Sequence, residues 1–472
     1  MELTRRRLLE SAGMGFGSLA LAALLNQDSL PAATTGLYND LKPRPGHFPG
    51  KAKAVIQLFQ TGGASQMDLF DPKPQLAKRQ GQAVPASIET FQAGNANVLL
   101  GPVFKFEKRG KCGMEMSEVL PQLGTVADEL CLVRSMFTEH NNHPEGNYMM
   151  QTCKVFPGRP SAGAWISYAL GTENQNLPAY IVLRDPASSP YKANWSSGWL
   201  PAIYQGVEFN TKGTPVHHLD SADPLPPGVQ TDSLDLIRKL NRVHQAQHPR
   251  EQELESRIQN YELAARMQLA AADVLDLSKE SANTLRLYGI DDPVTAPYGT
   301  RCLMARRLVE AGVRYVQVFA PMEGWDHHNQ IRRGLESVCS KVDRGSAALI
   351  QDLKARGLLD STIVLWTGEF GRLPITQGGS GRDHNRHGFS LLLAGGGFKS
   401  GYVHGETDEF GYKAVVNRVS VPDLHATILW QLGIDHNRLI YPYHGLPETP
   451  TDAKVNGARV VADLLQAPAK AV

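Results

Sequence analysis

The sequence predicts an α/β fold built around buried strands. Two short apolar runs, Thr362–Thr367 and Phe389–Ala394, are rich in β-branched or large apolar residues and are bounded by glycine or polar residues, as buried strands are. Other runs of this kind alternate along the chain with segments whose apolar residues recur every three or four positions, as in helices. Polar residues that can do chemistry gather where the strands end, which is where open α/β sheets bind ligands.

Taken in order, the chain gives further strands and helices on the same evidence. Strands are expected at 53–60, 131–136, 179–183, 313–319, Thr362–Thr367 and Phe389–Ala394. Helices are expected at 117–127, Ala162–Leu170, 298–311, 330–356 and 421–432. A polar, weakly periodic excursion at 80–112 and a Pro-, Gly- and Trp-rich stretch at 184–230 interrupt this alternation.

Residues 231–290 differ in character from the rest of the chain. The segment is charged, rich in Ala and Leu and nearly free of Gly, and its apolar residues recur at helical spacing. A break is expected near His248-Pro249, and Gly289 ends the segment. We expect a helical insertion that divides the α/β part into residues 50–230 and 291–472, and that also offers an oligomerisation face.

The N-terminal residues 1–33 predict export. Arg5-Arg6-Arg7 precedes a moderately apolar, Gly- and Ala-rich run that is too short and too Gly-rich for a stable membrane span. The paired arginines followed by leucine resemble a twin-arginine signal, with an ordinary secretory signal or an uncleaved anchor as the alternatives. The expected location is periplasmic or at the cell surface, with membrane contact only through an uncleaved signal. The formal net charge of +1 gives no overall field that favours nucleic acid.

Four strand ends carry clusters of carboxylates, imidazoles and guanidinium groups. The candidate residues are Ser65, Asp68, His140, His143, Asp326, His327, His328, Glu369, Arg372, Arg382, Asp383, His384 and His387. None of the clusters contains cysteine, and such a donor set suits zinc, manganese, iron or calcium. Two alternatives remain open at this point. The groups can simply hydrogen-bond one another in a polar crevice, or they can belong to a Ser-His-Asp hydrolase, although the chain has no GxSxG elbow.

A succession of motifs resembles a family of exported bacterial proteins of unknown function, often labelled sulfatase-like, within the alkaline phosphatase-like superfamily. The motifs are GG-x-S-x-x-D-x-F-D-P-K (62–73), N-H-P (142–144), GWD-x-H (324–328), TGEFGR (367–372), GRDH (381–384) and LAGGG (393–397). The resemblance implies a three-layer α/β/α sandwich of alkaline phosphatase/sulfatase type, with metal-assisted ester hydrolysis at the strand ends. It also implies an anionic small-molecule or polysaccharide ester as the substrate.

The resemblance assigns roles to individual residues. A divalent metal (zinc, manganese or calcium) would be held by Asp326, His328, Glu369, Asp383 and His384, with His387 as an alternative final histidine. Arg372 and Arg382 would hold the anion, because guanidinium groups bind sulfate and phosphate bidentately. His143 would act as general acid/base, or as nucleophile by its position. Ser65, Asp68, His140 and His327 are further candidates.

The sequence departs from the superfamily pattern at three places. Gln60 stands where a ligating Asp is expected, His143 begins the segment where a sulfatase has its Cys or Ser nucleophile, and Glu369-Phe370 replaces an Asp-His pair. Two hypotheses follow. The first is an exported metal-dependent hydrolase of sulfate or phosphate esters with an altered active site. The second is a catalytically inactive binding or accessory protein on the same fold.

Overall fold

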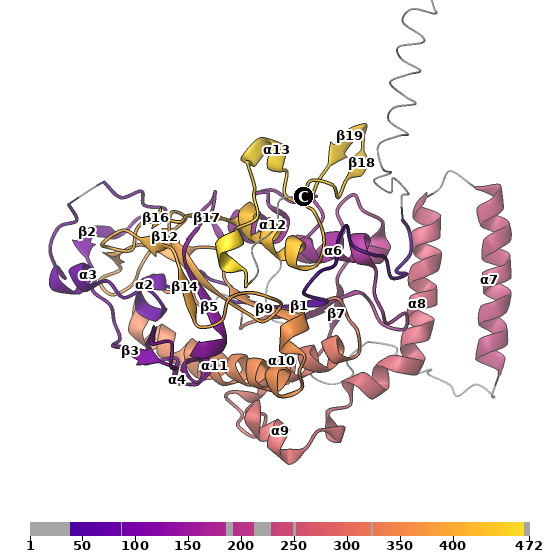
Figure 1. The fold of residues 1–472 in the computed structure, drawn as a ribbon, viewed down its shortest axis with the longest axis horizontal. Helices are drawn as coiled ribbons and strands as arrows, with labels where there is room; N and C mark the ends of the chain where they lie inside the picture. The colour runs from indigo at the N-terminus through magenta and orange to yellow at the C-terminus, as the bar shows by residue number, and fades with distance from the viewer. Residues whose placement is uncertain are drawn as a thin grey trace, which may run out of the picture.

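A nine-stranded sheet forms the centre of the protein in the computed structural model, which describes residues 38–85, 87–185, 192–211, 228–248, 252–321 and 324–466 (Figure 1). Eight strands lie side by side, and a ninth, β17 (Val419–Ser420), pairs with β5. The spatial order is β14 (Tyr402–His404), β5 (Leu130–Phe137), β13 (Phe389–Ala394), β9 (Thr362–Thr367), β1 (Ala54–Phe59), β8 (Tyr315–Phe319), β6 (Tyr180–Leu183) and β7 (Val207–Phe209).

Strand β13 is antiparallel to the other strands of the sheet. Its start and the end of β9 therefore lie at the same edge of the sheet. It pairs antiparallel with both β5 and β9, whereas β9, β1, β8, β6 and β7 are mutually parallel. The register joins Ala394 to Val364 and Leu392 to Trp366. The residues just before β13 therefore lie beside the residues just after β9, at the carboxyl edge of the parallel strands.

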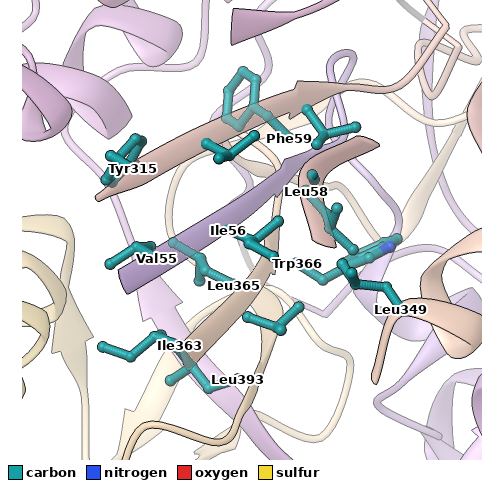
Figure 2. Close-up of a cluster of buried hydrophobic side chains, with 14 of the residues drawn as sticks. Val55, Ile56, Leu58, Phe59, Tyr315, Leu349, Ile363, Leu365, Trp366 and Leu393 are labelled. Atoms are coloured by element: carbon teal, nitrogen blue, oxygen red, sulfur yellow. The ribbon is translucent and has the colours of Figure 1, made fainter. Parts of the chain in front are cut away.

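The middle strands are mostly apolar and are buried along their whole length, because both faces of the sheet are covered. Every residue of β1 and β9 is buried. Figure 2 shows their side chains packed with Tyr315, Leu349 and Leu393. Gln57 is the polar exception in β1, and its side-chain oxygen accepts hydrogen bonds from Tyr315 and Gln317. The strands predicted at these positions are confirmed.

Helices cover the sheet on both sides, so the predicted α/β fold with helical layers is confirmed (Figure 1). On one side lie α10 (Ala296–Glu310) and α11 (Ile331–Ala355), and on the other lie α6 (Ala162–Leu170) and α12 (Val421–Gln431). Helix α5 (His143–Thr152) follows β5 and starts at the carboxyl edge. Shorter elements complete the part described: α2 (Gln66–Leu69), α3 (Pro74–Lys78), β10 (Gly371–Arg372), β12 (His384–Asn385), β15 (Glu406–Thr407), β16 (Ala414–Val416), β18 (Tyr441–Tyr443), β19 (Leu446–Glu448) and α13 (Ala453–Asn456).

The helix predicted at 117–127 is wrong. Strand β4 (Met114–Ser117) ends there, and only the four-residue α4 (Pro121–Gly124) follows. Pro121 takes the first helical position, and a proline disfavours helical backbone in the residue before it, so the helix cannot extend backwards through Leu120.

The excursion at 80–112 contains β2 (Asn95–Leu99), which pairs with β11 (Ile375–Gln377), and β3 (Phe106–Arg109), which pairs with β4.

The segment predicted as a helical insertion contains α7 (Val229–Gln247), α8 (Gln252–Leu275) and α9 (Ala282–Leu287). Figure 1 shows α7 at the far side of α8, away from the sheet. The predicted signal at 1–33 lies outside the described residues. Among the residues that are described, no helix combines the length and the apolar character needed to cross a membrane.

Candidate metal centre

Four loops bring charged side chains together at the carboxyl edge of the sheet. Asp326 follows β8, Glu369 follows β9, His143 begins α5, and His384 lies in the short strand β12 that precedes β13. The antiparallel direction of β13 is what carries His384 back to this edge. The four residues come from three connections of the central sheet, because Glu369 and His384 both lie between β9 and β13. Local spacing in the sequence therefore does not reveal their proximity.

The Asp326 carboxylate is the centre of this group. Its Oδ1 lies 2.9 Å from Nε2 of His328, 3.2 Å from Nε2 of His384 and 2.6 Å from Nη2 of Arg372. Its Oδ2 lies 3.5 Å from Nε2 of His143. Three imidazoles thus present the same ring nitrogen to one carboxylate.

Each imidazole is held from behind by an oxygen acceptor at Nδ1. His143 contacts Oε1 of Glu369 at 2.6 Å, and His384 contacts the Asn141 carbonyl at 2.7 Å. His328 contacts Oε1 of Gln377, whose amide nitrogen donates to the Ala93 carbonyl and so fixes which end of the amide faces the ring. Acceptors at Nδ1 place a proton there, and in the neutral ring Nε2 is then a free lone pair.

This arrangement fits a metal ion. Ligating histidines in proteins are oriented by a carbonyl or carboxylate at the other ring nitrogen, as these three are. One donor atom each from His143, Asp326 and His384 lies within 4.8 Å of the others. Among the described residues, Nε2 of His143 and of His328 and Oε2 of Glu369 are buried without a hydrogen bond. Imidazoles with a carboxylate suit zinc or manganese better than calcium, which prefers oxygen ligands.

The site strongly shifts the pKa values of its own groups. Burial alone would raise the pKa of Asp326, but the three imidazoles and the Arg372 guanidinium hold it well below its usual range. Burial lowers the pKa of His143, but Asp326 and Glu369 outweigh it and raise that pKa to about 9. Burial, with Arg372 and His143, lowers the pKa of His384 to about 4 against the opposing effect of Asp326. Asp326 is therefore ionised and His384 neutral at pH 7.

Glu369 combines two contacts that fix it behind His143. Its Oε1 accepts from the backbone N–H of Gly62 at 2.8 Å as well as facing Nδ1 of His143. Gly62 has φ of +116°, and a Cβ there would lie 2.7 Å from the backbone nitrogen of Asp326. A glycine is required at this position for the first-strand loop to pass so close to the metal centre. Phe370, next to Glu369, packs against the rings of His143 and His384, with centroid distances of 5.0 and 4.7 Å.

The two arginines expected to hold an anion are turned into the protein. Both are fully buried. Arg372 donates to the carbonyls of Gly62 and Gly63 and to Asp326. Arg382 forms an ion pair with Asp68, with Nε 2.7 Å from Oδ2, and donates to the Gly101 carbonyl. Their donors are directed at internal acceptors, which leaves neither guanidinium facing a bound anion.

Asp383 lies behind the centre and fastens a neighbouring strap, residues 89–95. Its Oδ2 accepts from the backbone N–H groups of Phe91 and Gln92 and from the side chain of Asn95, and its Oδ1 accepts from the backbone of His384. Phe91 stacks on the His384 ring with centroids 5.2 Å apart. The structure thus gives Asp383 the position of an outer support for the His384 ligand.

The remaining candidates lie around this core in separate contacts. Ser65 donates to Asp68 at 2.5 Å. His140 accepts from the backbone of Asn142 at 3.1 Å, and His387 contacts Glu89 at 2.8 Å on the outer side of the strap. His327 packs against α11 at Gly334, where an added Cβ would clash with its ring. No sequence motif singles out the residues that support the histidines, which are Gln377, Asn141 and Phe91.

Comparison with known proteins assigns the chain to a family. Residues 52–465 match the family described as "Protein of unknown function (DUF1501)". The chain belongs to the DUF1501 family. No curated protein sequence matches this DUF1501 member significantly.

Several solved structures are similar to this DUF1501 protein at low sequence identity. The lipoteichoic acid synthase LtaP from Listeria monocytogenes is 9% identical, with 85% of this chain and 76% of that chain covered and a TM-score of 0.36. The PsFucS1 sulfatase from Pseudoalteromonas sp. is 14% identical, with 81% and 68% covered and a TM-score of 0.34. A protein in the alkaline phosphatase superfamily from Vibrio parahaemolyticus is 10% identical, with 86% and 74% covered and a TM-score of 0.34.

Proposed function

We propose that this DUF1501 protein is an exported, metal-dependent hydrolase of sulfate or phosphate esters with an altered active site. The observation that carries the proposal is the convergence of three Nε2 atoms on the Asp326 carboxylate, each ring held at Nδ1 by an oxygen. The motifs that resemble the alkaline phosphatase-like superfamily support ester hydrolysis as the chemistry. The twin-arginine-like segment supports export to the periplasm or the cell surface.

The residues that would hold the metal are Asp326, His328 and His384, and His143 lies beside them. A bound divalent ion would polarise the ester and activate a water molecule. Asp326 supplies a carboxylate that is ionised at pH 7, and His384 supplies a neutral imidazole, so both are ready to ligate. Zinc or manganese is the favoured identity because most of the donors are nitrogen.

His143 and Glu369 supply the proton chemistry in this proposal. Glu369 fixes the imidazole and stabilises its protonated form, which suits His143 to deliver a proton to a leaving oxygen. The start of α5 replaces the arginines as the anion-facing element. The helix starts at the carboxyl edge, and a helix N-terminus favours negative charge, although Pro144 has no N–H to donate and Glu145 already lies in the first turn.

The alternative is a catalytically inactive binding or accessory protein. Two observations favour it: the segment that begins with His143 has neither Cys nor Ser at the expected nucleophile position, and Phe370 stands where an active relative has a histidine. Direct attack by water requires no protein nucleophile, and the retained ligand set supports the hydrolase. Hydrolysis is therefore the function that we infer first.

The test compares bound metal and turnover in matched variants. The mature chain, purified without chelator, is expected to carry close to one divalent ion per chain by elemental analysis and to hydrolyse at least one ester from a panel of aryl sulfates, phosphate monoesters, phosphate diesters and sulfated oligosaccharides. Asp326→Ala and His384→Ala should lose both properties. His444→Asn, which changes an exposed histidine between β18 and β19, is the control. Bound metal with no turnover would favour the binding protein, and absence of both would reject the hydrolase.

A further inference from the structure

Helix α7 carries an apolar stripe that the rest of the described chain leaves open. No residue of α7 is buried. Leu236, Ile237, Leu240 and Val243 expose 58%, 50%, 59% and 60% of their surface. Large apolar side chains that line one helix face in this way usually mark an interaction site.

The stripe follows the spacing of a coiled-coil seam. Val229, Leu236 and Val243 are seven residues apart, and Leu240 lies four residues after Leu236. Seven-residue repeats with apolar residues at two positions keep one seam facing a partner helix. The contacts of α7 with α8 use other positions: Arg238 pairs with Glu262, and Gln245 donates to Glu255. The seam is therefore separate from the face that holds α7 to its own chain.

The charges beside the seam indicate what covers it. Asp232 and Lys239 flank the seam on the same side and carry opposite charges. Lys239 directly precedes Leu240, and Asp232 directly precedes Ser233, the polar residue seven positions before Leu240. In an antiparallel pair of helices, residues on one flank face the same flank of the partner. The two kinds of seam position alternate across such a pair, so with the two-fold axis between Ser233 and Leu236, Asp232 of each copy lies opposite Lys239 of the other, and Val229 lies opposite Leu240. A symmetric dimer requires a surface that is complementary to itself in this way.

Other arrangements lack this match. In a parallel pair the flank that holds Asp232 and Lys239 would face the opposite flank, where Ile237 and His244 stand. An anionic membrane surface would favour cations on both sides of the seam, whereas Asp232 lies directly beside it. We propose that α7 forms an antiparallel coiled coil with α7 of a second copy of this chain, and that the protein is a homodimer through this helix. The proposal does not depend on the metal centre.

The first test measures the oligomeric state of the mature chain by sedimentation equilibrium and by light scattering after size exclusion. The wild type is expected to be a dimer in the micromolar range. Leu236→Glu places two carboxylates beside the two-fold axis and should raise the dimer Kd at least about 100-fold. Leu236 is exposed and glutamate is a good helix former, so circular dichroism should stay at the wild-type value, and so should Tm when both proteins are measured below the dimer Kd. Arg242→Asp, a charge reversal on α7 outside the seam, is the matched control and should remain dimeric.

The second test fixes the orientation by exchanging charges. Asp232→Lys and Lys239→Asp should each weaken self-association about tenfold at low salt, because like charges then face each other twice in the dimer. The double variant D232K/K239D should recover wild-type affinity, and a mixture of the two single variants should form heterodimers. A wild type that is monomeric throughout, or a Leu236→Glu variant that stays dimeric, would overturn the proposal. A monomer that binds phosphatidylglycerol vesicles through α7 would overturn it in favour of a membrane contact.

Discussion

His384 directs its Nε2 atom at Oδ1 of Asp326, 3.2 Å away, while its Nδ1 contacts the carbonyl of Asn141. The carbonyl retains a proton at Nδ1, and the pKa of His384, about 4, disfavours a second proton at Nε2. A neutral imidazole lone pair therefore faces a carboxylate, two electron-rich groups that repel unless a cation lies between them. His328 differs, because its Nε2 lies 2.9 Å from the same oxygen and Asp326 raises the pKa of this ring. The geometry is thus best satisfied by a bound metal.

Metal binding should consequently stabilise the folded protein. At a free metal concentration about 100 times its Kd, a ligand that binds only the native state adds about 2.7 kcal/mol to the free energy of unfolding. We expect zinc or manganese to raise Tm in the chelated wild type and a chelator to reverse the rise. Asp326→Asn should show no shift, whereas His444→Asn should shift like the wild type. Equal shifts in the wild type and in Asp326→Asn would place the metal elsewhere.

The support behind His328 should tune metal affinity without providing a ligand. Gln377→Leu removes the acceptor at Nδ1, which should weaken metal binding about 10- to 100-fold, as loss of an outer partner does. Gln377→Glu keeps an acceptor oxygen there and should bind metal more tightly than Gln377→Leu, although it gives up the bond to Ala93. Competition with a chromophoric chelator measures both values. Identical affinities for the two variants would remove Gln377 from the metal centre.

Asp383 should act through the strap and not through direct ligation. In Asp383→Asn, an amide N–H₂ must face either the three donors at Oδ2 or the single donor at Oδ1, so at least one buried N–H loses its acceptor. We expect a loss of about 2–3 kcal/mol in the free energy of unfolding, because hydrogen bonds to a charged group are worth about that much. Limited proteolysis should cut within 89–95 sooner than in the wild type. Complete loss of metal with unchanged stability would instead make Asp383 a ligand.

The sequence could predict that the side chains of the site lie close together, because these residues stand at the ends of predicted strands. Asp326, Glu369 and His384 each follow or precede a short apolar run of the kind that forms a buried strand. The carboxyl ends of parallel strands meet at one edge, and the reversed β13 adds its own start to that edge. Sequence alone thus brought together Asp326 and His384, which lie 58 positions apart.

The division of roles within the site could not be predicted in this way. Asp383 and Asp326 look alike as carboxylates beside histidines, yet four N–H donors surround the first and three imidazoles face the second. Arg382 could not be distinguished from an anion-binding arginine without the position of Asp68, which lies 314 residues away. These differences depend on side-chain direction and on distant partners, and neither leaves a periodic trace in the sequence.

The buried pair of Asp68 and Arg382 should therefore affect folding and not substrate binding. Removing one partner leaves an uncompensated buried charge and typically costs about 3–5 kcal/mol, so Asp68→Leu and Arg382→Met should each be strongly destabilising. The double variant should lose less than the sum of the two single losses, because it leaves no charge unpaired. Urea unfolding of the wild type, the two single variants and the double variant gives the four free energies of unfolding for this comparison. Additive losses would show that the two side chains do not act as a pair.

His425 gives a separate, pH-dependent term in stability. It lies on α12, and its Nε2 contacts the carbonyl of Met150 at 2.8 Å. Burial lowers its pKa from 6.5 to about 4, while the bond to Met150 opposes the shift. The native state therefore resists a proton that the unfolded chain accepts. The stability that this histidine contributes is fully present above pH 6.5 and is lost as the pH falls toward 4, by roughly 3 kcal/mol at most.

His425→Gln tests this term, because glutamine keeps a donor for Met150 but does not titrate. The free energy of unfolding, measured in urea at pH 7.0, 5.5 and 4.5, should fall less steeply for the variant than for the wild type. The difference between the two curves should open below pH 6.5, whereas other buried histidines such as His384 contribute equally to both and cancel. His444→Asn, at an exposed position, should follow the wild-type curve. Parallel curves for the wild type and His425→Gln would mean that the unfolded chain and the native core protonate His425 at the same pH.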